Sequence, residues 1–114
     1  MEDTGEWVNE VRLVGKVSGE VDERSLPSGD TVAAWRLVVP RPGADGAKQS
    51  GSAVKVDTID IACWTGRTRQ TARRLVTGER VEVVGALRRR FFRAGGATAS
   101  RYEVEATKVT RRAG

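Results

Sequence analysis

The sequence predicts an all-β fold, with five strands and one short helix between the third and fourth strands. Apolar and polar residues alternate along most of the chain, which is the period of a half-buried strand. Residues 66–76 break that pattern and place apolar side chains at helical spacing. Glycine and proline separate these segments as turn residues. With 114 residues, the chain has the length of one domain.

The first two strands are expected over residues 7–21 and 31–39. Gly15 interrupts the first strand and indicates a β-bulge or a bend at the corner of a barrel. Between the strands, residues 26–29 have proline and glycine where a type I turn favours them. One face of the second strand is expected to enter the core, and it carries Ala33, Trp35, Leu37 and Val39.

The middle of the chain contains a loop, a strand and the helix. Residues 40–53 have no periodicity and are rich in proline, glycine, serine and alanine, which predicts a mobile loop. The third strand is expected over residues 54–64. Thr65 then caps a helix over residues 66–76, which Gly78 ends. The buried stripe of this helix is expected to contain Thr68, Ala72, Leu75 and Val76.

The last two strands, residues 80–92 and 100–109, are predicted to form a closing hairpin around Gly95 and Gly96. Five strands with a helix between the third and the fourth is the arrangement of the OB-fold. This fold is a five-stranded Greek-key barrel that often binds oligonucleotides.

We expect the OB-fold domain to cover residues 7–111, between a flexible N-terminus over residues 1–6 and a C-terminal end over residues 112–114. The chain has 20 lysine and arginine residues against 15 aspartate and glutamate residues, a net charge of +5. This balance favours a polyanionic partner. The acidic, polar start and the lack of a long apolar run indicate no signal peptide and no membrane span, so we expect a cytoplasmic protein.

The residue types argue against catalysis and against a metal or cofactor. The chain has no histidine, which is the commonest general base and metal ligand. Its single cysteine, Cys63, excludes an internal disulfide and a multi-cysteine zinc site, and fits a reducing compartment. Asp57 and Asp60 lie three residues apart on a predicted strand, hence on opposite faces. We expect no enzyme, no metal and no cofactor.

The segment "GALRRRFF", residues 85–92, combines positive charge with aromatic rings. Sequence-tolerant binding of single strands requires both, because bases stack on the rings and phosphates pair with the cations. In a strand that projects beyond the barrel, neither face has to serve a core. One face then carries Arg88, Arg90 and Phe92, which we expect to contact DNA. Arg89 and Phe91 are left to face a neighbouring subunit or a second stretch of the DNA strand.

Four segments carry a resemblance to a known family. They are "NEVRLVGKV", "LPSGDTVAAWRLVV", "VDTIDIACWTGRTRQTARRLVTGERVEVVGALRRRFF" and "SRYEVEATKV", within residues 8–110. Together they resemble the bacterial single-stranded DNA-binding (SSB) proteins. The resemblance implies a protein that coats single-stranded DNA in replication, repair or recombination, usually as a homotetramer, with a dimer as the smaller assembly.

The resemblance also implies site residues. It places stacking aromatic rings at Trp64 and Phe92, and puts Thr58 and the region near Gly43 where further tryptophans are usual. Trp7 is left open between stacking on DNA and covering an interface. Cations that flank the rings are expected to contact phosphates, and they are Lys16, Arg36, Lys55, Arg88, Arg90 and Arg93. Two cations near the loop, Arg41 and Lys48, are expected to close over a bound strand. The helix arginines are interpreted as a solvated face.

An OB-fold adaptor of the primosomal replication protein type, acting mainly through protein partners, remains the alternative. Its support is the chain end "TKVTRRAG", which lacks the glycine-rich tail with acidic residues that recruits repair enzymes in the SSB family. We therefore expect no partners that depend on an acidic tail. A specialised process, such as DNA uptake or chromosome segregation, is then favoured, unless the tail has been removed from a longer chain.

Overall fold

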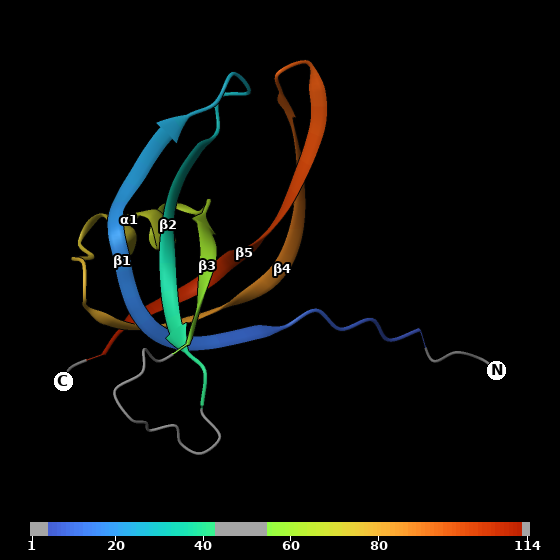
Figure 1. Ribbon diagram of the computed structural model, residues 1–114. Coiled ribbons are helices and arrows are strands. Elements are labelled where there is room, and N and C mark those ends of the chain that lie inside the picture. The colour runs from blue at the N-terminus through green and yellow to red at the C-terminus, as the bar shows by residue number, and fades with distance from the viewer. Residues whose placement is uncertain (1–4, 43–54, 113–114) are drawn as a thin grey trace.

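The computed structural model describes residues 5–42 and 55–112, which form a small barrel with two projecting hairpins (Figure 1). Its elements follow the predicted order. They are β1 (Val11–Ser25), β2 (Thr31–Pro40), β3 (Val56–Cys63), α1 (Gly66–Arg73), β4 (Arg80–Ala94) and β5 (Ala97–Arg111). Most of the predicted loop over residues 40–53 lies outside the described residues.

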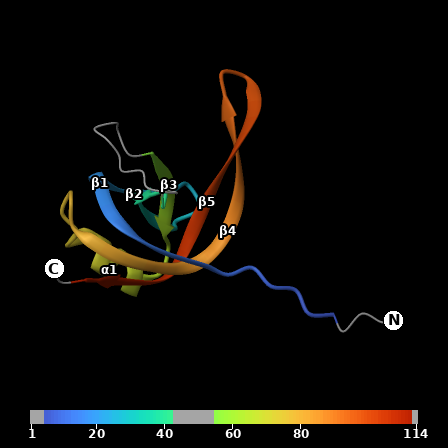
Figure 2. The ribbon, with the colours of Figure 1, turned by 60° about the horizontal axis from the view of Figure 1, so that its bottom comes forward.

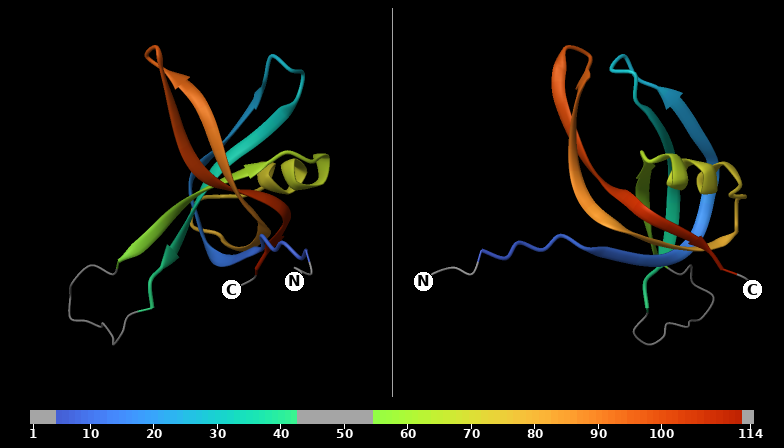
Figure 3. Two further views of the ribbon diagram at one scale, coloured as in Figure 1. Left: turned by 90° about the vertical axis from the view of Figure 1, so that its right-hand side faces the viewer. Right: turned by 180° about the vertical axis from the view of Figure 1, so that it is seen from behind.

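The five strands close into a barrel in the order β1–β2–β3–β5–β4. Neighbouring strands are antiparallel except for β3 and β5, which pair in parallel. This confirms the predicted OB-fold arrangement, in which α1 connects β3 to β4. The β1–β2 and β4–β5 hairpins leave the barrel on the same side and diverge (Figure 3). We call these projecting hairpins the two arms.

β1 begins at Val11, so the expected start at Trp7 is wrong. Residues 5–10 form no strand, and Trp7 and Val8 are 87% and 68% exposed. The side chain of Asn9, rather than the backbone of this segment, forms hydrogen bonds with β4. Its side-chain amide donates to the Leu87 carbonyl oxygen at 2.8 Å and accepts from the Leu87 N–H at 2.9 Å.

Gly15 marks the corner of the barrel rather than a bulge. β1 pairs with β4 as far as Lys16 and with β2 from Lys16 onward, so the strand changes partner beside Gly15. A Cβ atom on Gly15 would lie 2.4 Å from the carbonyl oxygen of Val38, which explains why the position requires glycine. The shift in register between β1 and β2 falls later, between Ser18 and Asp22.

The core confirms the predicted inner face of β2. Ala33, Trp35 and Leu37 are buried, and the indole nitrogen of Trp35 donates to Cys63 Sγ at 3.4 Å. Burial raises the pKa of the Cys63 thiol, which therefore stays neutral and unreactive. Trp35 is thus a core residue and contributes no stacking surface.

The helix begins as predicted but ends early. Thr65 is the N-cap, and its hydroxyl accepts from the N–H of Thr68 at 3.1 Å. α1 ends at Arg73 instead of Val76, because the next N–H groups bond to carbonyls three residues back and the Val76 N–H donates to the Glu79 side chain at 3.1 Å. Val76 is consequently 61% exposed, so its predicted place in the buried stripe is wrong.

Both predicted turns are present. The N–H of Gly29 donates to the Leu26 carbonyl oxygen at 2.8 Å, which closes the turn between β1 and β2. Gly95 and Gly96 have φ angles of +60° and +85° and join β4 to β5, and both strands extend farther toward this turn than predicted. The β4–β5 arm is therefore longer than the sequence pattern indicated.

Candidate nucleic-acid interface

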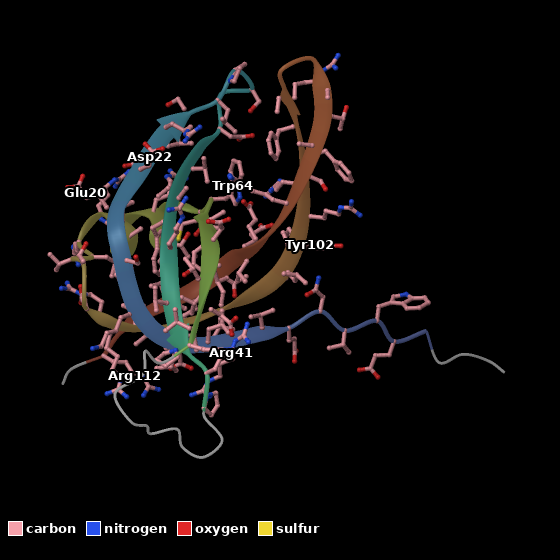
Figure 4. The ribbon with its side chains drawn as sticks, viewed as in Figure 1. Glu20, Asp22, Arg41, Trp64, Tyr102 and Arg112 are labelled. Atoms are coloured by element: carbon pink, nitrogen blue, oxygen red, sulfur yellow. The ribbon has the colours of Figure 1, made fainter. Side chains whose placement is uncertain are left out.

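A groove runs between the two arms at the end of β3. One hollow of about 370 Å³ is lined by both arms together with Trp64, and it adjoins a second hollow of about 300 Å³. The two hollows share four lining residues, Arg24, Ala34, Arg101 and Glu103, so they form one continuous depression. We call this depression the groove. Figure 4 shows Trp64 in the space between the arms.

Trp64 lies between the end of β3 and the start of α1, and its side chain is half-buried. Its carbonyl oxygen accepts from the Arg69 guanidinium, which fixes the backbone at this point. The indole Nε1 has no hydrogen-bond partner among the described residues. The guanidinium of Arg90 lies 4.9 Å from the ring centroid, so a cation faces the ring in the groove.

Arg90 is held in this position by a buried carboxylate. Its Nε donates to Glu103 Oε2 at 2.7 Å, and Glu103 is only 7% exposed. A second ring is arranged similarly, because the guanidinium of Arg101 lies 5.7 Å from the centroid of Phe92. Each groove ring therefore has a guanidinium beside it.

The opposite face of the β4–β5 arm has a different character. Arg89 donates to Ser100 Oγ at 3.1 Å and lies 5.0 Å from the ring centroid of Phe91. Leu87, Phe91 and Tyr102 are exposed on this face by 45%, 66% and 58%. We call these three residues the apolar patch. Two faces of one arm thus present two different surfaces, as the period-two pattern predicted.

The groove continues onto the outer face of β1, β2 and β3. Opposed residues in antiparallel strands point to the same side of the sheet. Ser18, Arg36 and Asp60 form one cross-strand row, and Lys16, Val38 and Thr58 form the next row away from Trp64. Arg36 Nε donates to Asp60 Oδ1 at 3.4 Å. Lys16, Arg36 and Thr58 therefore share the face that leads into the groove.

The sequence matches the Single-strand binding protein family over residues 8–111, nearly the whole chain. The chain belongs to this family. Members of the SSB family bind DNA and are not catalytic, which agrees with the expectation that this protein is no enzyme.

Solved structures agree with the family assignment at the level of the fold. A structure described as "Plasmodium falciparum SSB complex with ssDNA" is similar to this chain with a TM-score of 0.75 and 22% sequence identity. The similarity covers 99% of this chain and 100% of the other. No curated protein sequence matches significantly.

The structure brings some predicted site residues of this SSB chain together and leaves others apart. Trp64, Arg90 and Phe92 line the groove itself. Arg88 lies on the same face of β4 as Arg90, and its Nε donates to Glu105 Oε1 at 2.9 Å. Arg93 pairs with Thr98 near the tip of the arm, and strand alternation puts it on the face of the apolar patch.

Two other cations lie far from the rings, at the opposite end of the β2–β3 ladder. The carbonyl oxygen of Lys55 accepts from the N–H of Arg41 at 2.8 Å. The Arg41 guanidinium donates to Asp57 Oδ1 at 2.8 Å and lowers the pKa of that carboxyl. Arg41 is therefore already paired at its exposed position. Lys48 and Gly43 lie outside the described residues.

The helix arginines behave partly as structural residues. Arg73 forms two hydrogen bonds with Glu23, at 2.9 Å and 2.7 Å, and thereby ties α1 to β1. This hydrogen bonding lowers the pKa of Glu23. Arg67 and Arg74 are exposed, in agreement with a solvated face.

Arg101 and Glu103 are among the groove residues that were not identified from the sequence. Their register was available in principle, because counting back from the Gly95–Gly96 turn places Arg101 opposite Arg90 and Glu103 opposite Arg88. Within residues 5–42 and 55–112, no group of histidine, cysteine, aspartate or glutamate is arranged to hold a metal ion. The helix in this part of the chain is not long and apolar enough to cross a membrane.

Proposed function

We propose that this protein binds single-stranded DNA in the groove with little preference for sequence. The observation that carries the proposal is the meeting of Trp64 and Phe92, from two separate elements, in one groove with a guanidinium beside each ring. Membership of the Single-strand binding protein family supports it. So does the similarity in fold to the Plasmodium SSB structure, whose title names a complex with ssDNA.

The rings supply affinity without reading sequence, because every base has a flat face. Stacking on an aromatic side chain contributes about 1–3 kcal/mol per base. A base that enters the groove either replaces the guanidinium on the ring or stacks against it, since guanidinium planes also accept stacked bases. Thr58 offers no ring where the resemblance placed one, so we expect two main stacking positions within the described groove.

The arginines divide into two roles according to burial. The ion pairs Arg36–Asp60 and Arg88–Glu105 are exposed, with arginine side chains 66% and 52% accessible. Exposed ion pairs of this kind contribute about 0–1 kcal/mol to stability, so a phosphate can replace the carboxylate as the partner of the arginine. Arg90 is bound to a carboxylate that is 8% accessible and stays in place. We therefore assign phosphate contacts to Arg36 and Arg88, and ring positioning to Arg90.

We further propose that the protein assembles with itself as a dimer or a homotetramer. The apolar patch and the exposed Trp7 and Val8 support this, because burying them between subunits removes apolar surface from water. The cytoplasmic setting, the bacterial type of SSB and the process served belong to the same proposal. That process is replication, repair, recombination, DNA uptake or chromosome segregation.

The test is a titration with oligo-dT and with duplex DNA of matched length, at two salt concentrations. We expect tighter binding of the single strand and steep weakening by salt, about 0.7 in log affinity per log salt for each phosphate contacted. A variant with Trp7→Phe removes an exposed fluorophore and leaves Trp64 as the reporter in the groove. Equal affinity for both DNA forms contradicts the proposal. Failure to bind either form at low salt favours the adaptor alternative.

A further inference from the structure

The arginine that faces Trp64 is already paired with a carboxylate on the floor of the groove. Arg90 Nε donates to Glu103 Oε2 at 2.7 Å, and a terminal nitrogen of the same guanidinium lies 3.9 Å from Glu105 Oε1. Glu103 is 7% exposed and lines both hollows of the groove. The charge of the cation over the Trp64 ring is therefore balanced before any ligand enters.

The position of Glu103 follows from the register of the arm. Figure 2 shows β5 between β3 and β4, in agreement with its pairing to both strands. Arg90 in β4 is directly opposite Arg101 in β5, and Glu103 lies two residues farther along β5. Diagonal neighbours of this kind are within reach of long side chains. Glu103 therefore pairs with Arg90 by a diagonal contact, while Arg101 lies beside the ring of Phe92.

This ion pair differs in burial from two other arginine–carboxylate pairs at the groove. Asp60 and Glu105, the partners of Arg36 and Arg88, are 37% and 32% accessible, whereas Glu103 is 8% accessible. An exposed carboxylate can be exchanged for a phosphate at little cost. A buried carboxylate resists this exchange, because losing its arginine would leave it unpaired and away from water. Arg90 is therefore a poor phosphate ligand.

Stability alone does not explain a carboxylate at this place. Buried ion pairs contribute little net stability, because the desolvation of both groups offsets their attraction. A carboxylate on the floor of the groove also weakens the attraction of the groove for a polyanion. It does, however, distinguish the two parts of a nucleotide, because it repels a phosphate and does not repel an uncharged base.

We propose that Glu103 is a specificity-determining residue, which makes the Trp64 end of the groove accept a base and reject a phosphate. The inference rests on the proposed function of the groove. By holding Arg90 over the indole ring, Glu103 presents a flat guanidinium on which a base can stack, with its charge already balanced. The strand then binds with its bases toward Trp64 and its phosphates toward Arg36 and Arg88.

The test compares oligo-dT with an abasic strand of the same length, which has the phosphates without the bases. A length of roughly 8 nucleotides lies within the range that an OB-fold site takes. The variant is Glu103→Gln, which keeps the shape of the side chain and removes the carboxylate. The matched control is Glu105→Gln, the same substitution two residues along the same face of β5, at the exposed partner of Arg88. Anisotropy gives both affinities over a range of salt concentrations.

In Glu103→Gln the guanidinium of Arg90 becomes available to a phosphate. We expect affinity for the abasic strand to rise about tenfold, as for one added hydrogen bond to a charged group, and its salt slope to steepen by about 0.7. Affinity for oligo-dT should change little, because the phosphate competes with the stacked base for the same guanidinium. The ratio of oligo-dT to abasic affinity therefore falls. Glu105→Gln should strengthen binding of both strands similarly and leave that ratio unchanged.

A double variant tests whether Glu103 acts through Arg90. Arg90→Gln together with Glu103→Gln lacks the released cation, so the gain in abasic affinity should disappear. Urea denaturation gives the stability of each variant. A purely structural role of Glu103 would lower the stability and both affinities without changing the ratio between them.

The unmodified protein gives a second measurement, which does not depend on the folding of a variant. Arg36, Arg88 and Arg90 each donate from Nε to a carboxylate, so their Nε–H signals in ¹⁵N NMR spectra report on the three ion pairs. The abasic strand has no bases whose ring currents would move these signals. When it is added, we expect the Arg36 and Arg88 signals to shift and the Arg90 signal to stay in place.

Four outcomes overturn the inference. They are an unchanged affinity ratio in Glu103→Gln, an equal change of the ratio in Glu105→Gln, a gain that persists in the double variant, and a saturable shift of the Arg90 signal with the abasic strand. If the unmodified protein still prefers oligo-dT in these cases, the groove proposal stands without the role of Glu103. If it binds oligo-dT no more tightly than the abasic strand, the groove proposal itself has failed.

Discussion

The β4–β5 hairpin has two halves that use the same strands in different ways. In the barrel half, Val81, Val83 and Val104 are buried at 2% exposure or less. In the arm half, the same face of β4 continues into Leu87, Arg89 and Phe91, which are exposed. The difference is one of surroundings, since the barrel closes around the first half and stops before the second. Where the strands extend beyond the barrel, both of their faces are free of the core, and in this arm both faces carry arginine and aromatic residues.

The largest expected effect is a loss of DNA affinity caused by substitutions in the arm half. Replacing both groove rings, Trp64→Ala with Phe92→Ala, should cost about 2–6 kcal/mol of affinity for a short oligo-dT, since each stacked base contributes about 1–3 kcal/mol. Anisotropy of labelled oligo-dT measures this. Phe91→Ala is the control, because it removes an exposed phenylalanine ring from the other face of the same arm. A similar loss of affinity in the groove variant and in the Phe91 control would show that the two faces of the arm do not differ in DNA binding.

The barrel half should show the reverse behaviour. Val83→Ala is expected to lower the free energy of unfolding by about 2 kcal/mol, because it removes buried methyl groups and leaves a cavity. Leu87→Ala lies two pairs farther along the same face, is 45% exposed in the wild type, and should cost less than about 1 kcal/mol. Urea denaturation followed by circular dichroism gives both values. Equal losses would mean that the arm is packed as tightly as the barrel.

The apolar patch should affect assembly rather than folding. Phe91→Ser with Tyr102→Ser is expected to weaken self-association about tenfold or more, because burying one aromatic side chain contributes about 1.5–3 kcal/mol. Analytical ultracentrifugation over a range of protein concentrations measures the effect. A variant that keeps the wild-type subunit number at all concentrations would place the interface elsewhere.

The smallest effect concerns acid stability of the barrel half. The pKa of Glu79 is lowered by its hydrogen bond from Arg111, and that of Glu82 by Arg112 and Arg12. Lowered folded-state pKa values add stability above the unfolded value of 4.5, and this stability is lost as pH falls through the folded-state values. Glu79→Gln with Glu82→Gln should therefore flatten the loss of stability between neutral and acidic pH. An unchanged pH profile in urea denaturation would contradict this.

Period-two alternation predicted what depends on the backbone alone. The core face of β2 and the two faces of residues 87–92 follow from the geometry of a strand, so Trp35 was correctly separated from the exposed rings. The order of the strands and the helix along the chain followed from the same patterns. Trp64 and Phe92 came from the family resemblance, and the structure places both at one groove.

Element ends and the partners of charged groups could not be predicted in the same way. The first strand was expected to begin at Trp7, but a strand needs a ladder partner, and none of the described residues pairs with residues 7–10 as a strand. The end of α1 depends on Glu79, whose side chain takes the N–H of Val76. Glu103 gave no local signal as a groove residue, because its role depends on register with β4.

The most direct test of the groove uses the three tryptophans as reporters at three places. Trp64 lies in the groove, Trp35 in the core and Trp7 in the exposed N-terminal segment. Indole N–H signals in a ¹⁵N NMR spectrum, assigned by single Trp→Phe variants, are followed while a short oligo-dT is added. We predict that the Trp64 signal shifts in a saturable manner while the Trp35 signal stays in place. A saturable shift of Trp7 with an unmoved Trp64 would contradict the groove as the binding site.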